Sequence, residues 1–203
     1  MSKTRNISSI SAIILAAILL VSVLPVGAQN SAVSHYNSGV HKYKQGDFNG
    51  AITEFTKAIE INPEYWKAYS SRGVAKSAKR DFDGAIQDHT RSIQINPNNA
   101  GAYTNRGAVL RDKGDPESAL ADYATALRHD PQDAYSYNNR GVIRADRNDL
   151  DEAIADFSRA IEIYPEYAEA YFNRSVSRKR KGDVDNAKID RAMAIRLDPR
   201  LNR

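Results

Sequence analysis

Prolines recur along this sequence at one fixed interval. Five of the seven are 34 residues apart: Pro63, Pro97, Pro131, Pro165 and Pro199. Self-similarity at a period of this size indicates a repeat architecture, in which each unit is a small supersecondary element that packs on its neighbours. The prolines close five successive units, which span residues 32–65, 66–99, 100–133, 134–167 and 168–201.

Each unit predicts a pair of helices. A carboxylate accepts hydrogen bonds from the unpaired amide groups of a first helical turn. We therefore expect each second helix to begin after an aspartate, at Asp47, Asp81, Asp115, Asp149 and Asp183. Pro116 supports this placement, since proline is tolerated at the first helical position, and Glu152 completes a capping-box pattern. Apolar residues then follow at helical spacing, and the proline at the end of the unit stops the helix.

Two columns of small residues carry a resemblance to a known family. One lies in the first helices (Gly39, Gly73, Gly107, Gly141 and Ser175) and the other in the second helices (Ala51, Ala85, Ala119, Ala153 and Ala187). Together with the prolines, and with Tyr69 and its equivalents, the pattern resembles the tetratricopeptide repeat over residues 32–201. The resemblance implies an all-α fold, an α-solenoid in which antiparallel helix pairs stack into a right-handed superhelix. The sequence departs from the motif where arginine replaces leucine, at Arg72, Arg106, Arg140 and Arg174.

The N-terminus has the three-part layout of a secretory signal. Lys3 and Arg5 precede an apolar run from Ile13 to Leu24, and small residues follow up to Ala28. As a helix the run would span about 18 Å, short of the ~30 Å hydrocarbon core of a bilayer. Residues 1–28 are therefore predicted to be a signal peptide, and residues 29–203 the exported repeat domain, periplasmic or secreted. In the alternative, an uncleaved segment that starts near Ile7 anchors the protein in a membrane.

Few residue patterns favour chemistry. The chain has no cysteine, which excludes thiolate metal sites, disulfides and cysteine nucleophiles. The four histidines lack the spacing of metal ligands, and no phosphate-binding or hydrolase motif occurs. A net charge of +4 is too small to indicate nucleic acid. We expect a non-enzymatic protein with no metal and no cofactor, whose partner is a protein or peptide.

One stripe of each first helix is the candidate binding surface. The resemblance places this stripe on the concave side of the superhelix. Carboxamides recur along it beside small apolar residues, and because they both donate and accept hydrogen bonds they suit the backbone of an extended peptide. The predicted peptide-binding residues are Asn37, Ser71, Asn105, Asn139 and Asn173, with Lys67, Tyr135 and Phe172 beside them. In the alternative, the amides bond within the solenoid or across to the adjacent repeat.

An acidic column accompanies the arginine column. It lies in the second helices, one residue before the aromatic place of the motif: Glu54, Asp88, Asp122, Asp156 and Asp190. The matched intervals predict repeated ion pairs between helices, either inside one repeat or with the preceding repeat. In the alternative, the arginines line a groove for an anionic ligand.

Charge is unevenly distributed along the chain. Residues 168–203 carry a net charge of +5, against −3 for residues 29–167. Polar residues such as Lys188 and Arg191 are expected to cap the last repeat. The sequence thus predicts a scaffold or adaptor that binds an extended peptide or partner protein on its concave face. The alternative is an envelope assembly factor, tethered by its N-terminus, whose basic run from Arg178 to Lys181 meets an anionic surface.

Overall fold

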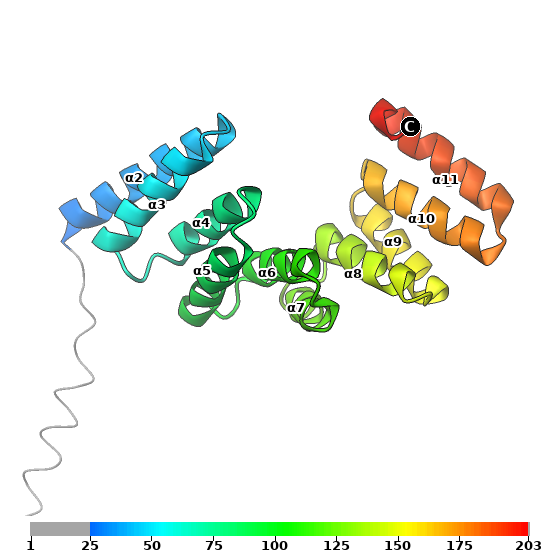
Figure 1. Cartoon of the computed structure of the whole chain (residues 1–203), viewed down its shortest axis with the longest axis horizontal. Coiled ribbons are helices and arrows are strands. Elements are labelled where there is room, and N and C mark those ends of the chain that lie inside the picture. Colours follow the sequence, from blue (N-terminus) through cyan, green and yellow to red (C-terminus); the bar gives the residue numbers. More distant parts are fainter. Residues whose placement is uncertain (1–24, 203) are drawn as a thin grey trace, which may run out of the picture.

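The computed structural model describes residues 25–202, which form a curved array of helices (Figure 1). This part of the chain contains no strand. Its elements are α2 (Val26–Lys44), α3 (Phe48–Ile61), α4 (Trp66–Ala78), α5 (Phe82–Ile95), α6 (Ala100–Lys113), α7 (Pro116–His129), α8 (Ala134–Asp146), α9 (Leu150–Ile163), α10 (Ala168–Lys181), α11 (Val184–Leu197) and a 3-10 helix over Pro199–Asn202.

The helices pack in the order of the sequence. Each even-numbered helix forms a hairpin with the helix that follows it, and the second helix of each hairpin packs on the first helix of the next. Contacts between elements that are not sequence neighbours are few and join successive first helices, such as α6 and α8. The predicted all-α solenoid of five stacked helix pairs is therefore confirmed.

The predicted aspartates stand at the N-termini of the second helices. Asp47, Asp81 and Asp115 each accept a hydrogen bond from the amide group three residues later, at 2.8–3.1 Å. This bond satisfies one of the amide groups that a helix leaves unpaired at its start. Asp149 and Asp183 precede α9 and α11 without making the bond, so the capping box predicted with Glu152 is wrong. The Asp183 carboxylate contacts Asn186 instead, at 2.9 Å.

One turn position inside every hairpin has a left-handed backbone. It is held by Gly46, Arg80, Gly114, Asn148 and Gly182, with φ between 64° and 91°. Glycine adopts this region without steric cost, and asparagine tolerates it better than other side chains do. The residues are again 34 positions apart, so the turn geometry repeats with the helices.

The core is continuous from one repeat to the next. Phe55, Tyr123 and Phe157 are fully buried, and each ring lies against the small residue of its own first helix. Ala75 of α4 completes the cluster around Phe55 from the following repeat. Because each repeat contributes to the burial of its neighbour's core, stability depends on stacking.

The predicted signal peptide lies mostly outside the described residues, which begin at residue 25. α2 starts at Val26, before the predicted start of the first repeat at residue 32. Among residues 25–202, no helix has the length and apolar character needed to span a bilayer.

Candidate functional site

The arginine and acidic columns form ion pairs inside each repeat. Nε and Nη2 of the guanidinium donate to the two carboxylate oxygens at 2.7–2.9 Å, across the two helices of one hairpin. The pairs are Arg72 with Asp88, Arg106 with Asp122, Arg140 with Asp156 and Arg174 with Asp190. All four aspartates are buried, at 6% exposure or less. The structural interpretation of the arginine column is confirmed, with the partner in the same repeat.

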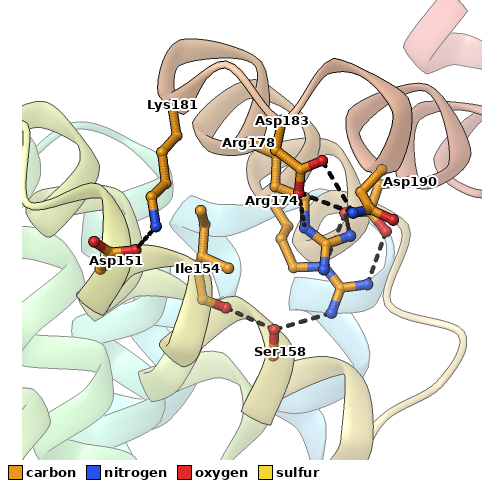
Figure 2. A network of polar contacts seen from close by, with 9 residues as sticks. Asp151, Ile154, Ser158, Arg174, Arg178, Lys181, Asp183 and Asp190 are labelled. Atoms are coloured by element: carbon orange, nitrogen blue, oxygen red, sulfur yellow. Dashed lines mark hydrogen bonds and ion pairs between the residues drawn. The ribbon is translucent and has the colours of Figure 1, made fainter.

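The same guanidinium groups reach the preceding repeat. Nη1 of Arg174 donates to the Ser158 hydroxyl at 3.0 Å, as Figure 2 shows. Arg72 and Arg106 make the equivalent bond to Thr56 and Thr90, also at 3.0 Å. Arg140 has no such bond, because Ala124 stands at that place. Each arginine that finds a hydroxyl thus joins its own hairpin to the one before it.

A second cation supports three of the four carboxylates. Lys76, Arg144 and Arg178 contact Asp88, Asp156 and Asp190 at 2.7–2.8 Å. The third repeat lacks it, because Leu110 holds the place. In the first repeat, where Ser38 replaces the arginine, the Glu54 carboxylate is 2.7 Å from His35 Nδ1.

The basic run at the end of α10 is mostly engaged inside the solenoid. Arg178 binds Asp190, Lys181 pairs with Asp151, and Arg180 donates to the Ala145 carbonyl at 2.7 Å (Figure 2 for the first two). These contacts explain three of the four cations structurally. They weaken the prediction that this run meets an anionic surface.

Four of the predicted binding residues line one cleft. Tyr135 and Asn139 from α8, and Phe172 and Asn173 from α10, face a cleft of about 680 Å³. Arg111 of α6 and residues 197–200 after α11 complete its wall. First helices therefore supply most of the side chains, which is the arrangement that the stripe predicts.

The two carboxamides in this cleft are each half occupied. Asn139 Oδ1 accepts a hydrogen bond from Arg111 at 3.1 Å, and Asn173 Nδ2 donates to Asn138 at 3.0 Å. Both bonds join successive first helices, so the alternative of bonding across repeats describes half of each amide. Within residues 25–202, the amide nitrogen of Asn139 and the amide oxygen of Asn173 have no partner. One donor and one acceptor thus remain in the cleft.

Sequence reasoning missed the aromatic wall of the cleft. Tyr135 and Tyr167 pack edge to face with ring centroids 5.3 Å apart, and Tyr164 lies 5.8 Å from Tyr167. Burial raises the pKa of Tyr167, whereas Tyr135 and Tyr164 are 56% and 42% exposed. Tyr164 stands where the other repeats have asparagine or aspartate before the proline. That departure from the column is the signal that could have identified it.

The other predicted residues lie elsewhere. Asn105 faces a separate cleft of about 260 Å³ between α4 and α6. Asn37, Ser71 and Lys67 line neither cleft, and Asn37 and Lys67 are exposed. The structure therefore brings together the residues of the fourth and fifth repeats and leaves those of the first three apart.

Charges of both signs surround the larger cleft. Arg111 and Arg200 lie among Glu166, Glu169 and Asp198. Arg200 donates two hydrogen bonds to Asp198, which lower the pKa of that carboxyl. A balanced set of charges favours neither an anionic nor a cationic ligand. Among the described residues, no cluster of three or more His, Asp and Glu side chains has the geometry of a metal site.

The fold defines a class of protein, the α-solenoids built from stacked helix hairpins. A tetratricopeptide repeat model matches residues 104–168, and a TPR repeat model matches residues 41–79. The 34-residue period and the paired helices agree with these matches. The chain belongs to the tetratricopeptide repeat family.

Several solved structures share the fold at low sequence identity. MamA from Desulfovibrio magneticus RS-1 is 18% identical, with a TM-score of 0.70 over 85% of this chain and 98% of that one. PilF of Pseudomonas aeruginosa is 16% identical, with a TM-score of 0.77 over 86% and 84%. YrrB, described as a TPR protein with an unusual peptide-binding site, is 23% identical, with a TM-score of 0.63 over 83% and 87%. No curated protein sequence matches the chain.

Proposed function

We propose that this chain is a non-enzymatic scaffold that binds an extended segment of a partner protein in the cleft between α8 and α10. The observation that carries the proposal is the pair of half-occupied carboxamides. Asn139 offers an N–H and Asn173 offers an oxygen, and an extended backbone presents the complementary carbonyl and amide groups. The fold relationship to YrrB, whose description includes a peptide-binding site, supports this choice.

The remaining walls of the cleft suit side chains of such a segment. Tyr135 and Tyr164 present rigid, exposed rings, which provide contact area at a low cost in conformational entropy. The balanced charges around them favour recognition through backbone and aromatic contacts. We expect the bound segment to carry at least one large apolar residue that packs on these rings.

A peptide-display selection against the full chain tests the proposal. Selected peptides should lose about tenfold or more in affinity for an Asn139→Ala/Asn173→Ala variant, since two hydrogen bonds are each worth about 1 kcal/mol. Asn98→Ala, in the exposed turn between α5 and α6, is the matched control and should bind as the parent does. Equal affinity for the parent and the double variant, with both folded, would show that peptides bind elsewhere.

Export is proposed on the sequence of residues 1–28 alone. The signal layout places the repeat domain in the periplasm or outside the cell, and the retained segment of the alternative would tether it to a membrane. The chain itself offers no disulfide to stabilise it in that compartment. Its stability then rests on the packing between repeats and on the buried ion pairs.

A further inference from the structure

The last repeat ends the array with an uncovered cleft. α10 and α11, which lie at the end of the array away from α2 (Figure 1), border a space of about 710 Å³. Its walls are mostly apolar and include Phe172, Val176, Val184 and Ile195. Val176 and Val184 are 43% and 46% exposed. The prediction of a polar cap at this end is therefore only half right, because cations frame an apolar floor.

One repeat earlier, the same surface is covered by a helix. Ile161 of α9 belongs to the buried cluster that includes Ala170 of α10. Asp151 pairs with Lys181 at the other end of the same contact. The last repeat keeps these two places, as Ile195 and Asp185, each 34 residues later. The cleft thus has the features that hold a helix in the inner repeats.

Basic residues distinguish this cleft from its inner counterpart. Three cations line it where α8 and α9 have apolar residues: Lys179 for Ala145, Lys188 for Ile154 and Arg191 for Phe157. Lys188 is 72% exposed in its pair with Asp185, and the Arg191 guanidinium lies 4.5 Å from the ring centroid of Phe172. A helix that covered these cations with apolar side chains alone would desolvate them without an opposite charge, which is costly. A helix that carries a carboxylate avoids this cost.

The inner repeats show which place of the helix would carry the carboxylate. Ile143 of α8 packs in one cluster with Leu120 and Tyr123 of the preceding repeat. Lys188 and Arg191 hold the places of those two residues in the last repeat. The residue equivalent to Ile143 in a docked helix would therefore face both cations.

A second copy of this chain lacks that carboxylate. α2, the first helix of a copy stacked head to tail, contains no acidic residue and ends in Lys42 and Lys44. Two copies joined through the cleft itself would oppose cations to cations. Residues 1–24 also contain no acidic residue. Charge complementarity thus favours a different protein as the occupant.

We propose that the cleft between α10 and α11 binds an amphipathic helix of a partner protein. The bound helix presents an apolar face, with an acidic residue at the place that Ile143 holds in α8. The site does not depend on the peptide cleft between α8 and α10, although Phe172 lines both. A partner could therefore occupy the end of the array while a peptide lies along it.

The probe for this site is a stapled helical peptide with the sequence of residues 134–146 that carries Ile143→Glu. The staple reduces the cost of ordering a short isolated helix. Its twin carries Ile143→Gln, which has a similar shape and no charge. By fluorescence anisotropy at low salt, the full chain should bind the acidic peptide about tenfold more tightly than the neutral one, and the difference should shrink in 1 M NaCl. Equal binding of the two peptides, or no binding of the acidic peptide, overturns the proposal.

Variants of the full chain assign the binding to this cleft. Lys179→Glu/Lys188→Glu should abolish the preference for the acidic peptide, whereas Lys44→Glu/Lys67→Glu, with the same change in net charge, should retain it. Val176→Asp should remove binding of both peptides while the helical circular dichroism stays unchanged. A preference that survives in Lys179→Glu/Lys188→Glu contradicts the assignment. So does a dimer, seen by sedimentation, that Val176→Asp dissociates, because a second copy would then be the occupant.

Discussion

The ion pair of the third repeat should be the most sensitive point of the array. Arg106 is the sole cation that contacts Asp122 among the described residues, whereas Asp88 retains Lys76 when Arg72 is removed. Both arginines also bind a threonine of the preceding repeat. Their aspartates are 6% and 4% exposed. Arg106→Ala and Arg72→Ala therefore differ mainly in the second cation.

The expected magnitude follows from what is left behind. Removing one partner of a buried ion pair costs about 3–5 kcal/mol, because the other charge stays buried and unpaired. Arg106→Ala should lose this amount, or about 6–20 °C in melting temperature for a domain of this size. In Arg72→Ala the Lys76 ammonium still neutralises the carboxylate, so the loss should be about 1–3 kcal/mol, the range for a hydrogen bond to a charged group.

Urea denaturation and calorimetry at pH 7 measure both losses, and a rescue variant tests the cause. Leu110→Lys introduces the cation that the second repeat has at Lys76. In the Arg106→Ala background it should recover about half of the lost stability. Equal losses in Arg72→Ala and Arg106→Ala, or no recovery with Leu110→Lys, would refute the role assigned to the second cation.

Three further predictions concern the buried histidine, the small-residue column and the N-terminus. His89 is fully buried with no hydrogen-bond partner on either ring nitrogen among the described residues, and burial lowers its pKa to about 4. Its contribution to stability should be complete above pH 6.5, and about 3 kcal/mol should be lost as the pH falls to 4. His89→Phe should therefore lack that part of the pH dependence in urea titrations, and an unchanged profile would contradict the assignment. A Cβ at Gly141 would lie 2.7 Å from the Phe157 ring, so Gly141→Ala should lose about 1–3 kcal/mol by denaturant titration. The open site of Gly101 makes Gly101→Ala the control, with a gain of about 0.5–1 kcal/mol. Mass determination of the protein from its native host should give a chain that starts at Gln29, and a retained Met1 would favour the membrane-anchored alternative.

The period of 34 residues made most of the fold predictable. It marked the starts of the second helices, because a capping aspartate and a terminating proline recur at each end. It also predicted the arginine–aspartate pairs. Which aspartate each arginine takes was open, because the separations are similar: Arg106 is 16 residues before Asp122 and 18 after Asp88. Packing of the two helices within one hairpin decides between them.

The candidate site was harder to predict because it breaks the repeat symmetry. The asparagine column gives five equivalent positions, yet the cleft forms only around Asn139 and Asn173. Tyr164, in a turn, and Arg200, after the last helix, build its walls, and neither belongs to a column that a periodic pattern can identify. The terminal cleft shows the same limit, since polar residues in two columns did not reveal that Val176 and Val184 stay exposed.

No guanidinium–carboxylate pair crosses a boundary between repeats, and this has a consequence for the length of the array. Deleting residues 100–133 would remove Arg106 together with Asp122 and leave every other pair intact. It would also place Thr90 of α5 where Ala124 now lies, so that Arg140 would gain the hydroxyl it lacks. Whole units can therefore be removed, duplicated or exchanged during evolution without separating a buried charge from its counter-ion.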